Sequence, residues 1–355
     1  MLIHSLPPNE MRYLSTLDGI RAVAVILVVV SHLILQLTDG AEPAFYSYRT
    51  MGRIGVAIFF VHTTLVLMMS LQRHGPAAIP FYIRRIFRIY PLAIVTVLFF
   101  ALLQLGSIPI DTGKLLSNLF LVQNITGYAS LPRPLWSLPY ELQMYLVLPA
   151  LYHLARTQQP VLWAIALWLS ATVLALLLPT QSLAHKLALY VPCFLPGFLA
   201  YLLAGRIRFE LSSACLFAFI AIAGTVLIPM LVKIGFSEMP LFWVFCLAIG
   251  IIIPASDELQ NRHIVRGASL VAKYSYGIYL THVLAMGAID GLVPGPKLVQ
   301  WGAMLVLLIG LAYMSYHGIE KRGIALGMRL AERYASRSRR TNSRNTPDSE
   351  QASGF

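Results

Sequence analysis

Ten stretches of mostly apolar residues alternate along this chain with polar and charged segments. Most of the stretches are about 20 residues long, the length that crosses the hydrocarbon core of a bilayer as an α-helix. The pattern predicts an all-α, polytopic membrane protein with about ten transmembrane helices. The predicted spans are 18–37, 54–72, 86–106, 137–156, 161–179, 186–204, 213–233, 240–254, 274–290 and 298–319. Pro192 and Pro196 interrupt the sixth span, and the eighth is short.

The composition agrees with a chain that lies mostly in lipid. Of 355 residues, 57% are hydrophobic and only 12% are charged, which excludes an ordinary soluble domain. The three cysteines, Cys193, Cys215 and Cys246, lie in apolar surroundings and form no CxxC pair. Neither a structural disulfide nor a zinc site is therefore expected, and no metal is predicted.

The distribution of Lys and Arg predicts the orientation in the membrane. With the N-terminus inside, the inner segments hold 19 of these residues and the outer loops hold 7; Arg21, on the first span, completes the total of 27. Cytoplasmic segments carry the excess of Lys and Arg, so both termini are predicted to be cytoplasmic. The net charge of +12 is attributed to this topology, and no nucleic-acid partner is expected.

The two ends of the chain need separate interpretations. The first span has the apolar core of a secretory signal peptide but no convincing small-residue cleavage site, so it is predicted to be retained. Residues 1–320 are predicted to form one membrane-embedded domain, and residues 321–355 a basic, disordered cytoplasmic tail. Anionic lipid of the inner leaflet is the expected partner of this tail, at about 1 kcal/mol per basic residue.

The first span carries three ionisable residues on one helix face. Arg21 and His32 are eleven residues apart, close to three turns, and Asp18 precedes Arg21 by three. With Arg21 at the cytoplasmic end, His32 lies roughly 16 Å away, in the outer half of the bilayer. Ionisable groups inside a bilayer are costly and usually face a cavity or a pathway. The alternative is an interfacial Arg with a hydrogen-bonded structural His.

Three arginines, Arg84, Arg85 and Arg88, cluster at the cytoplasmic start of the third span. Their spacings of three and four residues place them on neighbouring helix positions. Helix N-termini attract anions, and arginine binds phosphate bidentately. The cluster is therefore a candidate site for the phosphates of a nucleotide cofactor; the alternative is an ordinary positive-inside anchor.

Polar residues also mark three later spans. Glu141 follows Trp136 and Ser137 at the outer start of the fourth span and is expected to orient His32 or to hold an acceptor hydroxyl. Further on, Ser275, Tyr279 and His282 form one stripe of the ninth span, and such a stripe faces the bundle interior. Its members could instead form hydrogen bonds between helices. Glu320 ends the last span, where it could simply pair with Lys321 and Arg322.

These segments resemble the motifs of the acyltransferase-3 family, integral-membrane enzymes that modify bacterial glycans and other acceptors. The similar segments are Leu17–Ala22 with the Arg-x10-His spacing, Gly55–Val61, Phe81–Pro91, Trp136–Glu141, Ser275–His282 and Tyr316–Glu320. They run from residue 17 to residue 320, which is 304 of the 355 residues. Together, their order and spacing identify the chain as a member of this family.

The chain departs from the family pattern in two places. After Val61 the family usually continues with Leu-Ser-Gly-Phe, whereas this chain reads His62-Thr63-Thr64-Leu65. The difference indicates a subfamily and puts another histidine in the membrane, which is interpreted as a packed, hydrogen-bonded residue without an assigned role. The proline that usually accompanies the closing Glu is also absent.

The resemblance implies an O-acyltransferase of the bacterial cytoplasmic membrane. Its donor would be cytoplasmic acyl-CoA, by default acetyl-CoA, and its acceptor a hydroxyl of a glycan or glycolipid, such as lipopolysaccharide or exopolysaccharide, at the outer face. The expected catalytic residues are His32, Asp18, Arg21 and Glu141. The expected cofactor-binding residues are Arg84, Arg85, Arg88, Tyr279, His282 and Glu320.

Two alternatives stay open at this point. His32 either removes the proton of the attacking hydroxyl as a neutral base, or takes the acyl group itself and passes it outwards. The chain could also be a proton-coupled transporter or a glycolipid exporter, because broken helices and intramembrane charge suit both.

Overall fold

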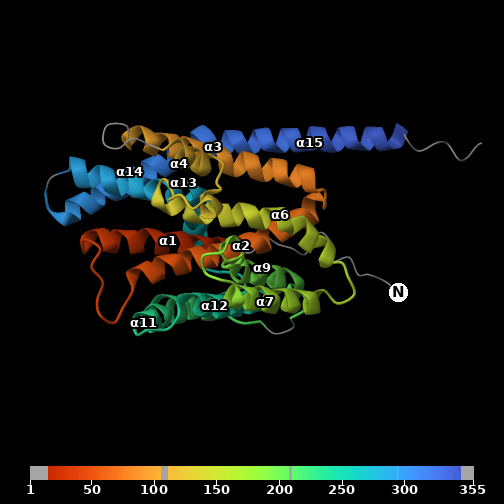
Figure 1. Ribbon diagram of the computed structural model, residues 1–355, viewed down its shortest axis with the longest axis horizontal. Coiled ribbons are helices and arrows are strands. Elements are labelled where there is room, and N and C mark those ends of the chain that lie inside the picture. Colours follow the sequence, from red (N-terminus) through yellow and green to blue (C-terminus); the bar gives the residue numbers. More distant parts are fainter. Residues whose placement is uncertain (1–14, 105–110, 208–209, 294, 345–355) are drawn as a thin grey trace, which may run out of the picture.

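A computed structural model describes residues 15–104, 111–207, 210–293 and 295–344 of the chain. The regular elements in these residues are helices, so the predicted all-α class is confirmed (Figure 1). They are α1 (Ser15–Leu37), α2 (Tyr48–His74), α3 (Ala78–Gln104), α4 (Thr112–Leu119), α5 (Gln123–Thr126), η1 (Arg133–Ser137), α6 (Leu138–Leu154), α7 (Pro160–Leu177), α8 (Leu183–Ala188), α9 (Val191–Leu203), α10 (Ser213–Phe219), η2 (Ile220–Leu227), α11 (Ile228–Lys233), α12 (Glu238–Ile252), η3 (Ile253–Ala255), α13 (Arg262–Leu292), α14 (Lys297–Ser315), η4 (Tyr316–Glu320) and α15 (Lys321–Arg344).

Eight helical segments of the described chain are long and apolar enough to cross a membrane. The sequence predicts about ten, and helices lie at all ten predicted positions. The two that fall short are α6, which has only 17 residues, and α13, which carries the polar stripe of the ninth predicted span. Both helices supply residues to the cavity described below. The short helix α6 and the polar helix α13 are thus both helices of the site.

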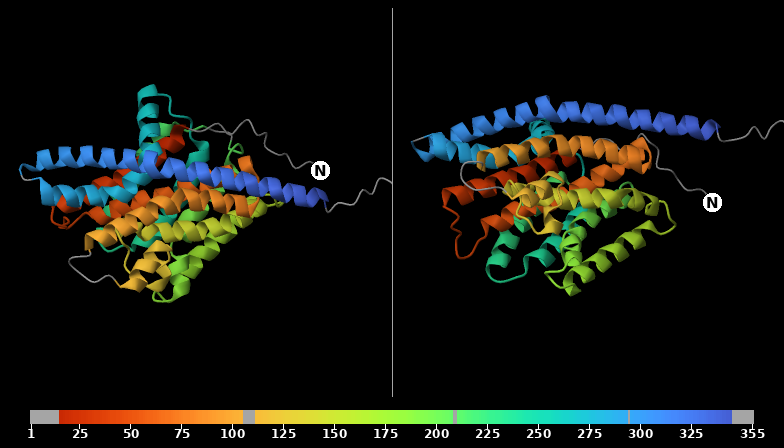
Figure 2. Two further views of the ribbon diagram at one scale, coloured as in Figure 1. Left: turned by 90° about the horizontal axis from the view of Figure 1, so that it is seen from above. Right: turned by 45° about the horizontal axis from the view of Figure 1, so that its top comes forward.

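Helix α2 is the centre of the bundle. Of its apolar window, 83% is buried, more than for any other of the eight segments. It packs against α1 on one side and α9 on the other, while α13 packs against α1 and α14 (Figures 1 and 2). Its first turn is closed by Ser47, whose hydroxyl accepts a hydrogen bond from the Thr50 N–H.

Glycines allow the backbones of these central helices to approach closely. A Cβ on Gly55 of α2 would lie 2.5 Å from the backbone oxygen of Ala24 in α1, and one on Gly197 of α9 would lie 2.2 Å from that of Val61 in α2. A similar contact joins Gly250 of α12 to α9. Small residues at helix contacts are the usual device for close packing inside a membrane.

We expect Gly197→Ala to destabilise the bundle, because its methyl group has no space between α9 and α2. Overpacking of this kind costs about 1–3 kcal/mol. Gly287 of α13 is the matched control, since a Cβ there meets no atom within 4 Å. Gly287→Ala should be neutral or slightly stabilising. Thermal unfolding of the purified variants in detergent measures the difference, and equal midpoints would show that the α2–α9 contact can relax.

The C-terminal segment differs from the predicted disordered tail. Lys321–Arg344 form α15, which continues the last span and lies along α3. Gly323, Gly327 and Ala331, one turn apart, make a buried seam of small residues, and a Cβ on Gly323 would lie 2.5 Å from a backbone oxygen of α3. This seam stabilises a helix that the Arg-rich composition obscured. Residues 345–355 lie outside the described residues.

Helix α15 extends past the end of the bundle, on the side where α2 is joined to α3 (Figures 1 and 2). Just before it, the last span contains the π-helical segment η4, Tyr316–Glu320. A second π-helical segment, η2, lies between α10 and α11. Such wide turns inside α-helices frequently occur at functional sites, and η4 carries one of the predicted site residues, Glu320.

Candidate active site

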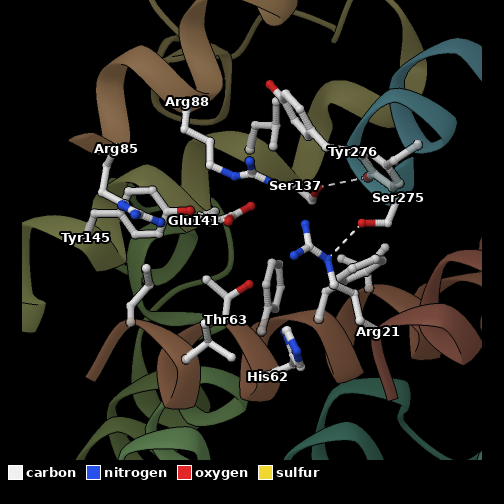
Figure 3. Close-up of a pocket in the computed structure, with 17 residues that line it drawn as sticks. Arg21, His62, Thr63, Arg85, Arg88, Ser137, Glu141, Tyr145, Ser275 and Tyr276 are labelled. Carbon is white, nitrogen blue, oxygen red and sulfur yellow. Dashed lines mark hydrogen bonds between the residues drawn. The ribbon is translucent and has the colours of Figure 1, made fainter. Parts of the chain in front are cut away.

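A cavity of about 100 Å³ lies inside the bundle, where α1, α2, α3, α6 and α13 meet (Figure 3). Aromatic and aliphatic side chains, among them Phe59 and Phe60 of α2, cover part of its wall. The polar side chains that line it are Arg21, His62, Thr63, Arg85, Arg88, Ser137, Glu141, Tyr145, Ser275, Tyr276 and Tyr279. Segments from residue 21 to residue 279 therefore contribute to one charged site within a largely apolar bundle.

Two of the three predicted α3 arginines reach the cavity. Arg85 and Arg88 line it and enter it from one side (Figure 3), whereas Arg84 does not. The Arg85 guanidinium carbon lies 6.0 Å from the Phe81 ring centroid, and its Nε is buried without a hydrogen-bond partner in the described residues. Neither Arg85 nor Arg88 forms an ion pair within the part of the chain that is described. Buried guanidinium donors without protein partners suit an anionic ligand.

Arg21 faces the cavity from α1, opposite the α3 arginines. Its Nε donates a hydrogen bond to the Ser275 hydroxyl at 2.7 Å (Figure 3). The Ser275 hydroxyl in turn donates to the Ala272 carbonyl at 2.9 Å. The contact fixes the guanidinium against α13. Asp18, one turn earlier, is buried but does not line the cavity.

The carboxylate of the cavity comes from the first turn of α6. Glu141 accepts a hydrogen bond from the Tyr145 hydroxyl, one turn further along the same helix. Figure 3 shows the Glu141 side chain between Tyr145 and Arg88. Tyr145 was not among the predicted residues, although its i+4 spacing from Glu141 is a signal that could have indicated it.

Tyr279 connects α13 to the segment before α6. Its hydroxyl donates to the Pro134 carbonyl at 2.6 Å, and the Ser137 hydroxyl lies 2.8 Å away, where it donates to the tyrosine oxygen. Tyr279 also lines the cavity. The residue thus closes one wall of the site and ties two of its elements together.

His32 and His282 lie outside this cavity but contact each other. Their ring centroids are 4.9 Å apart, with an angle of 60° between the planes. His282 is fully buried, and its ring is 6.1 Å from that of Tyr279. His282 thus lies between Tyr279 of the cavity wall and His32, the predicted base. The predicted cofactor-binding residue His282 does not line the cavity with Arg85 and Arg88.

Glu320 is buried in η4 behind α13. A Cβ on Gly277 would lie 3.3 Å from its Oε1, and neither carboxylate oxygen has a hydrogen-bond partner in the described residues. Glu320, although a predicted cofactor-binding residue, does not line the cavity. In the described part of the chain it forms no ion pair with Lys321 or Arg322.

Sequence reasoning left His62 without a role, and the structure places it in the cavity wall beside Thr63. His62 is buried in the central helix, and Figure 3 shows it on the same side of the cavity as Arg21. No group of three or more metal-ligating side chains occurs among the described residues. The polar groups that line the cavity are thus guanidinium, carboxylate, hydroxyl and imidazole groups.

The fold and the site define an integral membrane protein with a charged internal cavity. A family comparison then gives the class of enzyme: the model of acyltransferase family 3, described as an acyltransferase domain, matches residues 14–317, and the chain belongs to this family. The predicted family and enzyme class are therefore confirmed. The membership also favours the enzyme over the transporter or exporter interpretation.

Two relatives show how far the similarity extends. The chain is 32% identical to acyltransferase MdmB of Streptomyces mycarofaciens over 184 residues, which cover 48% of this chain and 47% of that protein. It is 30% identical to peptidoglycan O-acetyltransferase OatA of Listeria monocytogenes over 236 residues, 59% of this chain and 34% of that protein. The match thus spans about half of the first relative and a third of the second. No solved structure matches the chain.

Proposed function

We propose that this protein transfers an acetyl group from acetyl-CoA to a hydroxyl of a glycan or glycolipid at the outer face of a bacterial cytoplasmic membrane. The observation that carries the proposal is the cavity in which Arg21, Arg85 and Arg88 meet Glu141. Family membership supplies the acyl transfer, and a relative named as a peptidoglycan O-acetyltransferase supports acetyl and a glycan.

The α3 arginines are assigned to the donor. Arg85 and Arg88 present guanidinium groups to the cavity, and phosphate and pyrophosphate groups are the anions that such groups bind bidentately. In this proposal Arg84 strengthens the positive field at the cytoplasmic end, and Glu320 balances it from behind α13. Tyr279 then contacts the pantetheine arm where it leaves the cavity.

His32 is assigned the proton transfer. Its Nδ1 lies 2.9 Å from the Val28 carbonyl, which can only accept, so Nδ1 carries the ring proton and Nε2 is the basic nitrogen. The acceptor oxygen attacks the thioester carbon, the C–S bond breaks, and the hydroxyl proton moves to His32 and then to the departing thiolate. An acyl group carried on His32 remains the alternative route.

The remaining predicted residues support the donor site. Glu141 accepts the hydrogen bond of Tyr145 inside the cavity and partly offsets the positive charge of the arginines there. Arg21, fixed by Ser275, faces Arg85 and Arg88 across the cavity and helps to hold the anionic donor. Asp18, buried one turn before Arg21, stabilises this end of α1.

Mass spectrometry of surface glycans, with and without the protein, tests the proposal. The expected result is a loss of one acetyl group per acceptor in cells that lack the protein, restored by the wild-type gene. Unchanged glycans together with altered transport of a glycolipid across the membrane would overturn it in favour of the exporter.

Two aqueous entrances follow from this proposal, because the donor is cytoplasmic and the acceptor external. In a cysteine-free background, Arg85→Cys should react only with a reagent on the cytoplasmic side and Trp136→Cys only from outside. Acetyl-CoA should protect the first position and not the second. Labelling of both positions from one side would contradict the predicted topology and the two entrances with it.

Anionic lipid is the proposed partner of α15. Arg322, Arg329, Arg333 and Arg337 are exposed and recur at spacings of seven, four and four residues, which form one helix stripe. Changing the first three to Gln should reduce the stabilisation by phosphatidylglycerol in nanodiscs by about 1 kcal/mol per charge. The control removes three outer-loop charges, at Arg49, Lys114 and Lys186. Equal lipid dependence in both triple variants would contradict the assignment.

A further inference from the structure

The contact between His32 and His282 has a geometry that suits charge stabilisation. His282 comes from α13, its relative exposure is 0%, and its ring meets that of His32 at 4.9 Å and 60°. Buried polar atoms normally have hydrogen-bond partners. The Nε2 of His282 has none in the described residues, so this nitrogen is held inside the bundle next to the predicted base.

The hydrogen bonds of His282 fix its tautomer. Its Nδ1 lies 2.7 Å from the Tyr279 carbonyl and 3.3 Å from the Ile278 carbonyl, and both oxygens can only accept. Nδ1 therefore carries the proton, and Nε2 holds the lone pair. His32 has the same arrangement through Val28. Two neutral imidazoles thus lie together, each anchored to the backbone of its own helix.

We propose that His282 is a positioning residue that stabilises the positive charge on His32 during acyl transfer; this inference rests on the proposed function. In an edge-to-face pair, either the lone pair or the π face of one ring is directed at the other. Both attract an imidazolium more strongly than a neutral ring, so most of the stabilisation arises after His32 has taken the proton. Catalysis gains from interactions of this kind, which are stronger in the transition state.

The charge near His32 disfavours a positive imidazolium, which such a partner would offset. The other charged group that faces it, in the described residues, is the exposed Arg133 of η1, whose charge opposes a second positive charge on the imidazole. Within the bundle, His282 of α13 is the neighbour that can compensate. His282 exchanges no proton in this scheme: the acceptor proton moves to His32 Nε2 and then to the CoA thiolate.

Two substitutions separate the nitrogens of His282. His282→Asn retains a donor near the Nδ1 position for the Tyr279 carbonyl and removes Nε2, whereas His282→Gln places an amide near Nε2. We expect H282N to lower kcat by about 10- to 100-fold, less than the loss of a general base, with KM for acetyl-CoA unchanged. H282Q should recover part of this loss. The acid limb of the pH–rate profile should also move in H282N.

The assay uses membrane vesicles of the producing cell, which contain the natural acceptor, with radiolabelled acetyl-CoA. His317→Phe is the matched control, because His317 is also a histidine of a late helix but contacts Tyr274 and Tyr313 rather than the site. Size-exclusion profiles verify folding of each variant. Wild-type kcat and an unmoved pH profile in H282N would overturn this inference while the wild-type protein still transfers label. Absence of transfer by the wild-type protein would instead overturn the proposed function.

Discussion

His32→Ala is expected to reduce acyl transfer by about 10²- to 10⁴-fold, the contribution of a positioned general base. The Nε2 of His32, which is left free to accept a proton, and the contact of its ring with His282 motivate this expectation. Transfer is measured with radiolabelled acetyl-CoA in vesicles that contain the natural acceptor. The binding of acetyl-CoA should change little, because His32 does not line the cavity that holds the arginines.

His263→Ala provides the comparison for this variant. His263 is exposed in the first turn of α13 and is not part of the site. The His263→Ala variant should leave acyl transfer unchanged. The comparison then shows that the loss in His32→Ala is specific to that imidazole and is not a general effect of removing a histidine. A folded H32A protein that retains most of the wild-type rate would make His32 a structural residue, and the assigned proton transfer would then be wrong.

The double variant Arg85→Ala and Arg88→Ala is expected to weaken acetyl-CoA binding by about 30- to 1,000-fold. A hydrogen bond to a charged group contributes about 1.5–3 kcal/mol, and two neighbouring guanidiniums do not add fully. Isothermal titration calorimetry of the purified protein gives the change in Kd. At saturating acetyl-CoA, kcat should fall by a smaller factor than the affinity for acetyl-CoA. The reason is that the arginines hold the donor rather than react with it.

A matched pair of arginines distinguishes binding from topology. Arg73 and Arg266 are exposed, lie in segments predicted to be cytoplasmic and do not line the cavity. Their double change to alanine removes the same charge but should leave the Kd unchanged. If both double variants bind acetyl-CoA as the wild type does, Arg85 and Arg88 are positive-inside anchors and the donor lies elsewhere.

Helical periodicity predicted the shared face and the separation of these residues but not which of them lines the cavity. Arg21 and His32 share a face of α1, as the eleven-residue spacing requires, yet only Arg21 lines the cavity. Three turns of helix separate them, and at those two depths α1 meets different parts of α13: Ser275 contacts Arg21, and His282 contacts His32. Spacing along one helix gives a direction, whereas the partner at each level depends on tertiary packing.

Local spacing also explains what the sequence obscured. Tyr145 is one turn from Glu141, and the small residues of α15 recur every four positions, so both features were present in the sequence. Tyr145 was not predicted because the motif that resembles the family ends at Glu141. The helix α15 was not predicted because the Arg-rich average composition outweighed the periodicity of its small residues. Helices α6 and α13 lie at the fourth and ninth predicted spans, but neither meets the limits of length and hydropathy for a membrane span.

The volume of the cavity bears on how much of the donor it can hold. At about 100 Å³ it is smaller than the roughly 150 Å³ of an engineered apolar cavity that binds benzene. One phosphate group fits beside Arg85 and Arg88 in this volume, whereas a whole acetyl-CoA molecule does not. In the proposed function, therefore, either most of the donor lies outside the cavity or the helices around the cavity move apart when the donor binds.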